Sequence, residues 1–211
     1  SGALAAHIVP YKGGDSEWVV EQVARDIKKW GIRASVILRH DQEEALNDLA
    51  KEVIRQRQRE NLPTETRQFE EMSPVGESQS NGFIESGVRS FEGVLRTHKF
   101  ALEERLGVKI EVHHPIFAWL VEHVADTATK YQIGVDGLTA YQRLKGKTYS
   151  GEAVKFGSLV HHRAPCKPQG GCTQPRWYEG VYLGSRWDSQ EHVVAMADGR
   201  VVRAGSVAAF P

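Results

Sequence analysis

The chain has 211 residues, of which 40% are hydrophobic, and its 27 Lys and Arg residues balance its 27 Asp and Glu residues. A chain of this length can bury the core of one medium-sized domain and of a smaller second one. No apolar run approaches the ~20 residues that cross a bilayer, and no secretory leader is recognisable, so we expect a soluble intracellular protein of the nucleus or cytoplasm, with no membrane partner. The start at Ser1 without a methionine suggests a piece of a longer polypeptide.

Charge is divided unevenly along the chain. Residues 141–211 contain ten Lys or Arg and five Asp or Glu, a balance of +5, so residues 1–140 carry a balance of −5. A basic C-terminal region is where we expect contact with phosphate groups. Ordinary solvated surface is an equally good interpretation of this excess when charge alone is considered.

Strand and helix patterns alternate in the first part of the chain. Residues 3–10 form a short apolar run that suits a strand. Apolar residues at helical spacing then predict a helix that Ser16 caps and Gly31 ends. Residues 34–38 are nearly all apolar, which predicts a strand buried on both faces of a sheet. The alternation indicates an α/β fold.

An acidic residue, Asp41, follows this second strand. In open α/β sheets, ligands bind at the carboxyl ends of the strands, so Asp41 occupies a candidate ligand position. Residues 45–54 carry the apolar face of the next helix. We expect residues 55–66, which are polar and highly charged, to form the end of that helix and an exposed loop, and residues 67–72 to form one more short strand.

Helical spacing dominates the middle of the chain. It predicts one long helix over residues 81–106 and another over residues 116–131, joined through residues 108–113 as a strand or an extended connector. Thr139 is expected to cap a short helix that ends at Leu144.

After Gly146 the apolar period changes from 3.6 to 2. The short apolar runs are separated by Gly, Pro and Asp-Gly turns, and Asp198-Gly199 between two such runs is a strong hairpin signal. The sequence therefore predicts two domains, an α/β domain over residues 1–146 and a small antiparallel β-barrel over residues 147–211.

The run SPVGESQSNGFIES, from Ser73 to Ser86, places Glu85 at the start of the long helix, after a polar loop that contains glycine. Unpaired backbone N–H groups and the positive dipole end at such a junction attract anions. The run resembles the catalytic loop and third acidic residue of retroviral-type integrases and of the integrase region in copia-like retrotransposon polyproteins. A proline, the Gln79-Ser80 pair, a glycine and the Glu85-Ser86 pair keep the spacing of that family.

The C-terminal segment is also similar to this family. Its sequence from Phe156 onward, FGSLVHHR and later PRWYEGVYLGSRWDSQEHVVAMADGRVVRAGSVAAF, looks like the SH3-like module that follows the integrase core. The resemblance implies an incomplete ribonuclease H-like core followed by an SH3-like antiparallel β-barrel. It also implies DNA integration, with element ends and target DNA as partners and a homo-oligomeric assembly.

In the integrase family, three carboxylates hold two Mg²⁺ or Mn²⁺ ions. Asp41 matches the second carboxylate and Glu85 the third, so the resemblance implies that both are catalytic and metal-binding. Hard divalent ions take oxygen ligands, and a pair of them can activate the attacking oxygen and stabilise the leaving one in phosphodiester transfer. The implied activity is the processing and joining of DNA 3′ ends.

Four further positions are implied to contact DNA. Asn81 takes the loop position near the active site, and Arg89 lies one helical turn beyond Glu85, where a basic residue approaches the DNA end. Arg96 and Lys99 continue this basic face. Solvated helix surface is an equally good interpretation of the two arginines.

The chain also departs from the integrase pattern. It begins at what aligns with the third strand of the core, so we expect the first catalytic Asp upstream and the chain alone to be inactive. Asp15 is expected to be a helix-entry residue and no substitute. Gln42-Glu43 stands where the retroviral pattern has Asn-Gly, and the interval from Asp41 to Glu85, 85 − 41 = 44 positions, is wider than in retroviruses.

Other interpretations stay open. A non-catalytic nucleic-acid- or protein-binding remnant of an integrase would keep the basic C-terminal module without the metal site, and an unrelated nuclease of the same fold is a third possibility. His161, His162, Cys166 and Cys172 invite a zinc site. Adjacent histidines on a strand point to opposite faces, however, so we do not expect one.

Overall fold

A computed structural model describes residues 2–14, 16–33, 35–41, 43–59, 68–72, 78–163 and 175–209, and for residues 68–72, 78–81 and 83 it describes the backbone only. The chain divides into two compact units. One is Ile8–Ser90, and the other combines Ser1–His7 with Phe91–Pro211. These units are sets of residues that pack together, so the division at residue 146 stays a prediction.

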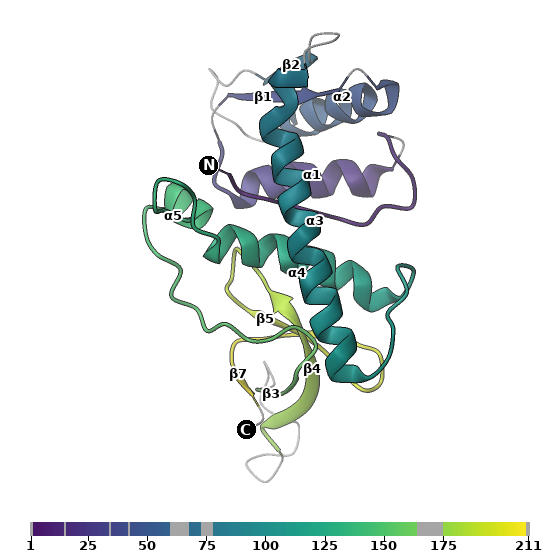
Figure 1. The fold of residues 1–211 in the computed structure, drawn as a ribbon, viewed down its shortest axis with the longest axis vertical. Coiled ribbons are helices and arrows are strands. Elements are labelled where there is room, and N and C mark those ends of the chain that lie inside the picture. Colours follow the sequence, from purple (N-terminus) through teal and green to yellow (C-terminus); the bar gives the residue numbers. More distant parts are fainter. Residues whose placement is uncertain are drawn as a thin grey trace. The chain divides into compact units, whose positions relative to one another are not determined.

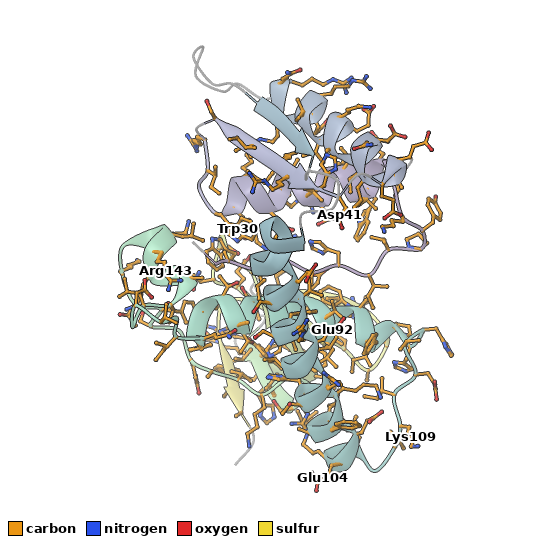
Figure 2. All side chains as sticks on the ribbon, turned by 45° about the horizontal axis from the view of Figure 1, so that its top comes forward. Trp30, Asp41, Glu92, Glu104, Lys109 and Arg143 are labelled. Atoms are coloured by element: carbon orange, nitrogen blue, oxygen red, sulfur yellow. The ribbon has the colours of Figure 1, made fainter. Side chains whose placement is uncertain are left out.

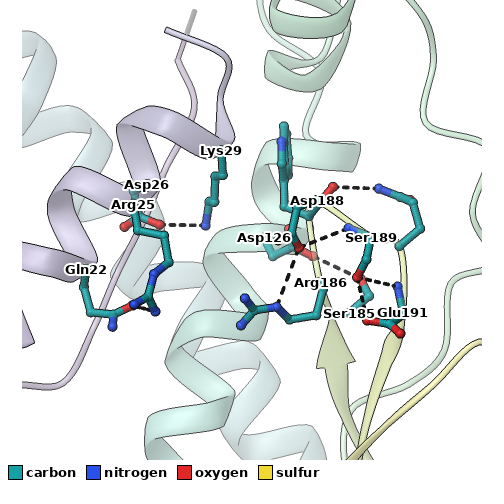
Figure 3. Close-up of polar contacts among 12 residues, drawn as sticks. Gln22, Arg25, Asp26, Lys29, Asp126, Ser185, Arg186, Asp188, Ser189 and Glu191 are labelled. Carbon is teal, nitrogen blue, oxygen red and sulfur yellow. Dashed lines mark hydrogen bonds and ion pairs between the residues drawn. The ribbon is translucent and has the colours of Figure 1, made fainter. Parts of the chain in front are cut away.

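The unit Ile8–Ser90 begins with helix α1 (Glu17–Lys29), which buries Val20 and Ile27. Gly31 follows it with φ of 81°, the left-handed conformation that ends the helix as predicted. Ser16 is the N-cap residue, but its side chain makes no capping hydrogen bond. Lys29 pairs with Asp26, a buried residue three positions earlier in the helix (Figure 3).

Strand β1 (Val36–His40), helix α2 (Glu44–Gln58) and strand β2 (Gln68–Met72) form a parallel βαβ arrangement (Figure 1). Val36 pairs with Gln68 and His40 with Met72. Parallel strands need such a crossover, which explains why a helix must lie between them. The two predicted strands are confirmed, with β1 lying two residues further along the chain than expected.

Burial of β1 differs from the prediction. Val36 and Leu38 pack against buried residues of α1 and α2, whereas Ile37 between them is 60% exposed. The expectation that this strand is buried on both faces was therefore wrong. In the described segments, α1 and α2 cover one face of the two-stranded sheet, and the side chains of a strand alternate between faces.

The strand predicted for residues 3–10 does not form. The backbone of Leu4 is hydrogen-bonded to a side chain instead, because the Leu4 N–H donates to Thr129 Oγ1 at 2.9 Å and this hydroxyl donates to the Leu4 carbonyl at 3.2 Å. An apolar run becomes a strand only when another strand supplies a ladder, and none lies beside it within the described segments.

Helix α3 (Ser78–Leu106) is the long helix predicted from the apolar spacing. It begins three residues before the expected Asn81, so Ser78, Gln79 and Ser80 are helical and do not belong to the loop. Its apolar stripe is buried unevenly. Phe91 and Leu95 pack against the core of the second unit, whereas Ile84 and Val88 are about half exposed.

Two further helices follow in the second unit. In α4 (Pro115–Tyr131), the His114 side chain caps the N-terminus by accepting a hydrogen bond from the Ile116 N–H. In α5 (Ala140–Lys145), Thr139 and Gln142 form a reciprocal capping box, which confirms the predicted cap. Residues 108–113, expected as a strand or a connector, form a connector that buries Ile110.

Five antiparallel strands complete this unit: β3 (Leu159–Arg163), β4 (Trp177–Ser185), β5 (His192–Ala195), β6 (Val201–Ala204) and β7 (Val207–Ala209). Their order is β6-β5-β4-β3-β7. Gly199, with φ of 84°, closes the predicted hairpin between β5 and β6. The sheet does not close into the expected barrel. Among the described residues, each edge strand pairs with its inner neighbour alone, whereas closure requires the two edges to pair with each other.

The five-stranded sheet has an apolar face on either side, because successive residues of a strand point to opposite faces. In β4, where a bulge shifts the register between Tyr182 and Gly184, Leu183 belongs to the core that also contains residues of α3 and α4. Tyr182 packs on the opposite side, with Val160 and Val194. Leu120 of α4 is fully buried in the first of these cores, which contributes roughly 1.5–3 kcal/mol relative to an exposed side chain.

None of the helices in the described segments has the length and apolar character needed to span a bilayer.

Candidate functional site

The parallel strand pair positions Asp41. This residue follows β1 directly, at the carboxyl end of the strand, and its side chain is exposed (Figure 2). The neighbouring His40 Nδ1 lies 2.8 Å from the Asp41 carbonyl oxygen, which orders the backbone at this turn. Two residues later, Glu43 forms an exposed ion pair with Lys12. The location of Asp41 is the one at which open α/β sheets bind ligands.

Glu85 lies on α3, seven residues after the helix begins at Ser78, and it is exposed. Both predicted metal ligands are thus reachable from solvent and offer the oxygen donors that Mg²⁺ and Mn²⁺ prefer. Over the described ranges, no three His, Cys, Asp or Glu side chains are grouped so as to hold a metal ion. Two carboxylates fall short of a complete site, and the convergence of Asp41 with Glu85 stays a prediction.

The basic residues predicted on α3 differ in their surroundings. Arg89 and Arg96 are exposed, and the Arg96 side chain donates to the Glu92 carbonyl at 3.3 Å. Lys99 forms an ion pair with Glu103, whose carboxylate also accepts from the Ile110 N–H at 2.7 Å.

Glu103 thus ties the end of α3 to the connector that follows it. The hydrogen bond from Lys99, and then that from the Ile110 backbone, lower the pKa of the Glu103 carboxyl. The ammonium of Lys99 therefore has a partner within its own helix. Asn81 lies in α3, but its side chain is outside the described part of the chain. The DNA-binding role of all four predicted residues stays a prediction.

Two aromatic residues that the sequence interpretation overlooked are exposed on β4. Trp177 is 45% exposed and Tyr178 is 37% exposed. Trp177 pairs across the sheet with the exposed Arg163 of β3, and Arg176 precedes it. Directly opposed side chains of neighbouring strands lie on the same face, so Arg163 and Trp177 project from the same face of the sheet.

Such a combination suits single strands or frayed ends of nucleic acid, since bases stack on aromatic rings and cations attract phosphates. The exposure of one of these aromatic residues could have been predicted from the sequence. Two consecutive aromatic residues in a strand cannot both face one core.

The histidines of β3 face opposite sides of the sheet. His161 is partly exposed and lies 3.8 Å from Glu179, whereas His162 is buried, with Nε2 at 3.0 Å from Met196 Sδ. Burial lowers the pKa of His162, so its ring is neutral at pH 7. The two cysteines of the zinc hypothesis, Cys166 and Cys172, lie outside the described residues.

No protein-family model matches the chain. A search among curated proteins finds no match either. The resemblance to integrases therefore depends on the residues quoted above and on their spacing.

Proposed function

We propose that this chain is part of the integrase segment of a copia-like polyprotein and that it contributes to metal-dependent joining of DNA 3′ ends. The observation that carries the proposal is the placement of Asp41. A carboxylate directly follows a parallel strand, and the motif that supplies Glu85 lies after the next strand and on a long helix. The order of strand, acid, helix, strand and acid-bearing helix is the order that the resemblance implies.

In the proposed reaction, Asp41 and Glu85 would supply two of the carboxylates that hold Mg²⁺ or Mn²⁺, and the resemblance implies a third carboxylate besides them. The ions would activate the attacking oxygen and stabilise the leaving one. The residues of this chain have two other tasks. Arg89, one turn beyond Glu85, would hold the phosphate of the DNA end. Arg163 and Trp177 would bind DNA through a phosphate contact and base stacking.

The C-terminal sheet supports the same assignment. Four strands follow one another as a meander, from β3 to β6, and the fifth returns beside the first. This arrangement is compatible with the proposed SH3-like module. The charge balance of +5 over residues 141–211 adds the electrostatic attraction that such a module needs for DNA.

A non-catalytic DNA-binding remnant is the second candidate. It is favoured by the exposure of Arg163 and Trp177, which oppose each other on neighbouring strands. The exposed Arg163 and Trp177 require no metal to bind nucleic acid, so this role would survive the loss of catalysis. The two candidates differ in one measurable property, which is metal-dependent strand transfer.

A strand-transfer assay tests the proposal. The polypeptide is made with its native upstream sequence and incubated with Mn²⁺ and a DNA duplex that ends in the element sequence. We expect Asp41→Asn and Glu85→Gln to abolish joining while leaving DNA affinity nearly unchanged. Glu92→Gln, an exposed carboxylate on the same helix (Figure 2), is the matched control and should retain full activity.

The outcomes separate the candidates. DNA binding without any joining by the unsubstituted protein supports the non-catalytic remnant. Joining that survives Glu85→Gln contradicts the assignment of the metal ligands. For the sheet surface, Arg163→Gln should weaken DNA binding and reduce the slope of affinity against salt by about 1, because one phosphate contact is lost. Arg200→Gln is its control, since Arg200 is paired with Asp198 at a hairpin turn.

A further inference from the structure

The unit Phe91–Pro211 contains a cavity of about 450 Å³ that the integrase assignment does not use. It lies between the C-terminal half of α3, helix α4, the connecting segment 149–156 and strand β4. Small-molecule sites in proteins measure about 300–1,000 Å³ and are lined mainly by apolar and aromatic groups. The walls here have that character, and they include Leu102, His123, Tyr131, Tyr149, Phe156 and Tyr182.

The polar groups of the cavity wall are held in place by one another. Lys130 is buried, and its ammonium pairs with Asp126 and donates to Ser185 Oγ at 2.8 Å. The same ammonium lies 4.5 Å from the centre of the Tyr149 ring. Figure 3 shows Ser185 beside Asp126. The charge of Lys130 is therefore balanced by Asp126, so Lys130 does not require an anionic ligand inside the cavity.

Two rings of the cavity wall, those of His123 and Tyr182, are neutral at pH 7. Burial lowers the pKa of His123 to about 4, and the ring lies 5.2 Å from Phe156 and 6.1 Å from both His98 and Tyr182, measured between ring centres. Burial also raises the pKa of Tyr182 to about 12, so its hydroxyl stays protonated. The interior thus presents uncharged ring surfaces, which favour a flat uncharged ring.

The exposed rim of the cavity has the opposite character. Arg105 and Lys155 are exposed cations, and Glu152 is the exposed acid among the lining residues, which gives 2 − 1 = +1 at the rim. Arg105 also donates to the Phe156 carbonyl, which fixes its guanidinium at the edge. If a ligand enters with its ring first, the group that remains at the rim therefore lies near these positive charges.

We infer that this cavity binds a small planar aromatic anion, a ring system of nucleobase or indole size with one phosphate or carboxylate left at the rim. The ring packs among the neutral aromatic walls, and the anionic group lies near Lys155 and Arg105. A mononucleotide and an aromatic carboxylic acid share this chemistry. The inference depends on the cavity alone and is independent of the proposed role in DNA integration.

Calorimetric titration and NMR shifts test the inference with defined probes. The charged probes are 2′-deoxyadenosine 5′-monophosphate and indole-3-carboxylate, and the neutral counterparts are 2′-deoxyadenosine and indole. We expect at least one charged probe to bind more tightly than its neutral counterpart and to shift the resonances of Ala101 and Ala153, which line the cavity. The probe that binds distinguishes a nucleotide from an aromatic acid.

Three variants locate the binding site. Lys155→Gln should raise the Kd of the charged probe about two- to fivefold, as expected for loss of one exposed charge pair, and leave the neutral probe unchanged. Lys147→Gln, an exposed lysine outside the cavity, is the matched control. Ala101→Phe should block both kinds of probe by filling the cavity, and Glu92→Phe on the same helix should not.

Two results would overturn the inference. The first is the absence of binding by all four probes up to about 10 mM, a concentration at which even weak aromatic ligands occupy such a site. The second is binding that Ala101→Phe leaves unchanged, since the probe would then sit elsewhere. Ala153→Phe, on another wall of the cavity, repeats the block independently. Neither result bears on strand transfer, so failure here and failure of the proposed function are distinguishable.

Discussion

The two sheets of this protein differ in how many strands they contain and in how much of their apolar surface is covered. In the unit Phe91–Pro211, β4 and β5 lie inside a five-stranded sheet, and Val194 is fully buried. In the unit Ile8–Ser90, β1 and β2 form a pair with helices on one face, and Ile37 is exposed on the other. In the antiparallel sheet, β3 to β6 pair in sequence order and β7 returns beside β3, whereas the parallel strands β1 and β2 are joined by a helical crossover. The inner strands of the unit Phe91–Pro211 are therefore hydrogen-bonded along both edges, whereas β1 and β2 each have one strand neighbour in the part of the chain that the structure describes.

The strongest test of this comparison removes a core side chain from the unit Phe91–Pro211. Leu120→Ala should lower the free energy of unfolding by about 2–5 kcal/mol, because Leu120 is fully buried between α4 and the sheet. Leu106→Ala, at a leucine that is 47% exposed, should cost much less. Denaturant unfolding followed by circular dichroism measures both. Equal losses would show that the core is misassigned.

Low pH should weaken the same unit through His123. Burial holds the pKa of His123 at about 4 in the folded protein, below the usual 6.5, so the ring is neutral when folded and the unfolded chain binds a proton more readily. The stability that depends on neutral His123 is fully present above pH 6.5 and is lost as the pH falls towards 4. The whole effect is about 3 kcal/mol.

Chemical unfolding at a series of pH values measures this loss. The His123→Gln variant, which cannot gain a proton, should lose less stability between pH 6.5 and 4 than the unsubstituted protein. An identical pH dependence in the two proteins would mean that His123 is accessible to water in the folded state. The histidine is thus a probe of how tightly the cavity and its walls are packed.

Prediction from sequence succeeded where one segment alone determines the structure. The 3.6-residue spacing identified α1, α2 and α4, and the two-residue spacing with Asp198-Gly199 identified the hairpin of β5 and β6. Prediction failed where the structure of a segment depends on another segment that pairs with it or covers it. The run of residues 3–10 has strand composition but no ladder, and β1 has apolar residues on both faces but a cover on only one.

Candidate sites show the same limit. Local sequence motifs identified Asp41 and Glu85 as candidates. The distance between the two side chains cannot be predicted from either segment, because it depends on how the segments pack. The pair of Arg163 with Trp177 depends on strand register, and the cavity is assembled from four segments. The burial of Arg57, in a stretch expected to be helix end and exposed loop, could not be read from a polar sequence either.

Arg57 is the sharpest test in the unit Ile8–Ser90. Its side chain is 1% exposed, and Nη2 donates to the Ile32 carbonyl at 3.3 Å, which joins α2 to the segment before β1. Arg57→Met keeps the aliphatic stem and deletes the donor, so it should cost about 1–3 kcal/mol. Arg55→Met, at an exposed arginine two residues earlier, is the control and should be nearly neutral. Urea unfolding that gave equal costs would contradict the buried position of Arg57.

The smallest expected effect concerns the capping box of α5. Thr139 Oγ1 accepts from the Gln142 N–H at 3.1 Å, and the Gln142 side chain accepts from the Thr139 N–H at 2.8 Å. Thr139→Ala removes the first bond and should lower stability by about 1 kcal/mol, whereas Thr139→Ser keeps a hydroxyl in place and should recover most of it. Thermal unfolding of the three proteins measures the difference. Helix α5 packs against α4, and Tyr141 of α5 contacts Trp187, so tryptophan fluorescence reports the unfolding of α5. If the fluorescence of the Thr139→Ala protein changes at the same temperature as the main transition, α5 unfolds together with the rest of its unit. A fluorescence change at a temperature well below the main transition would instead show that α5 unfolds by itself. The protein would then contain a third part, besides the two units, that unfolds independently.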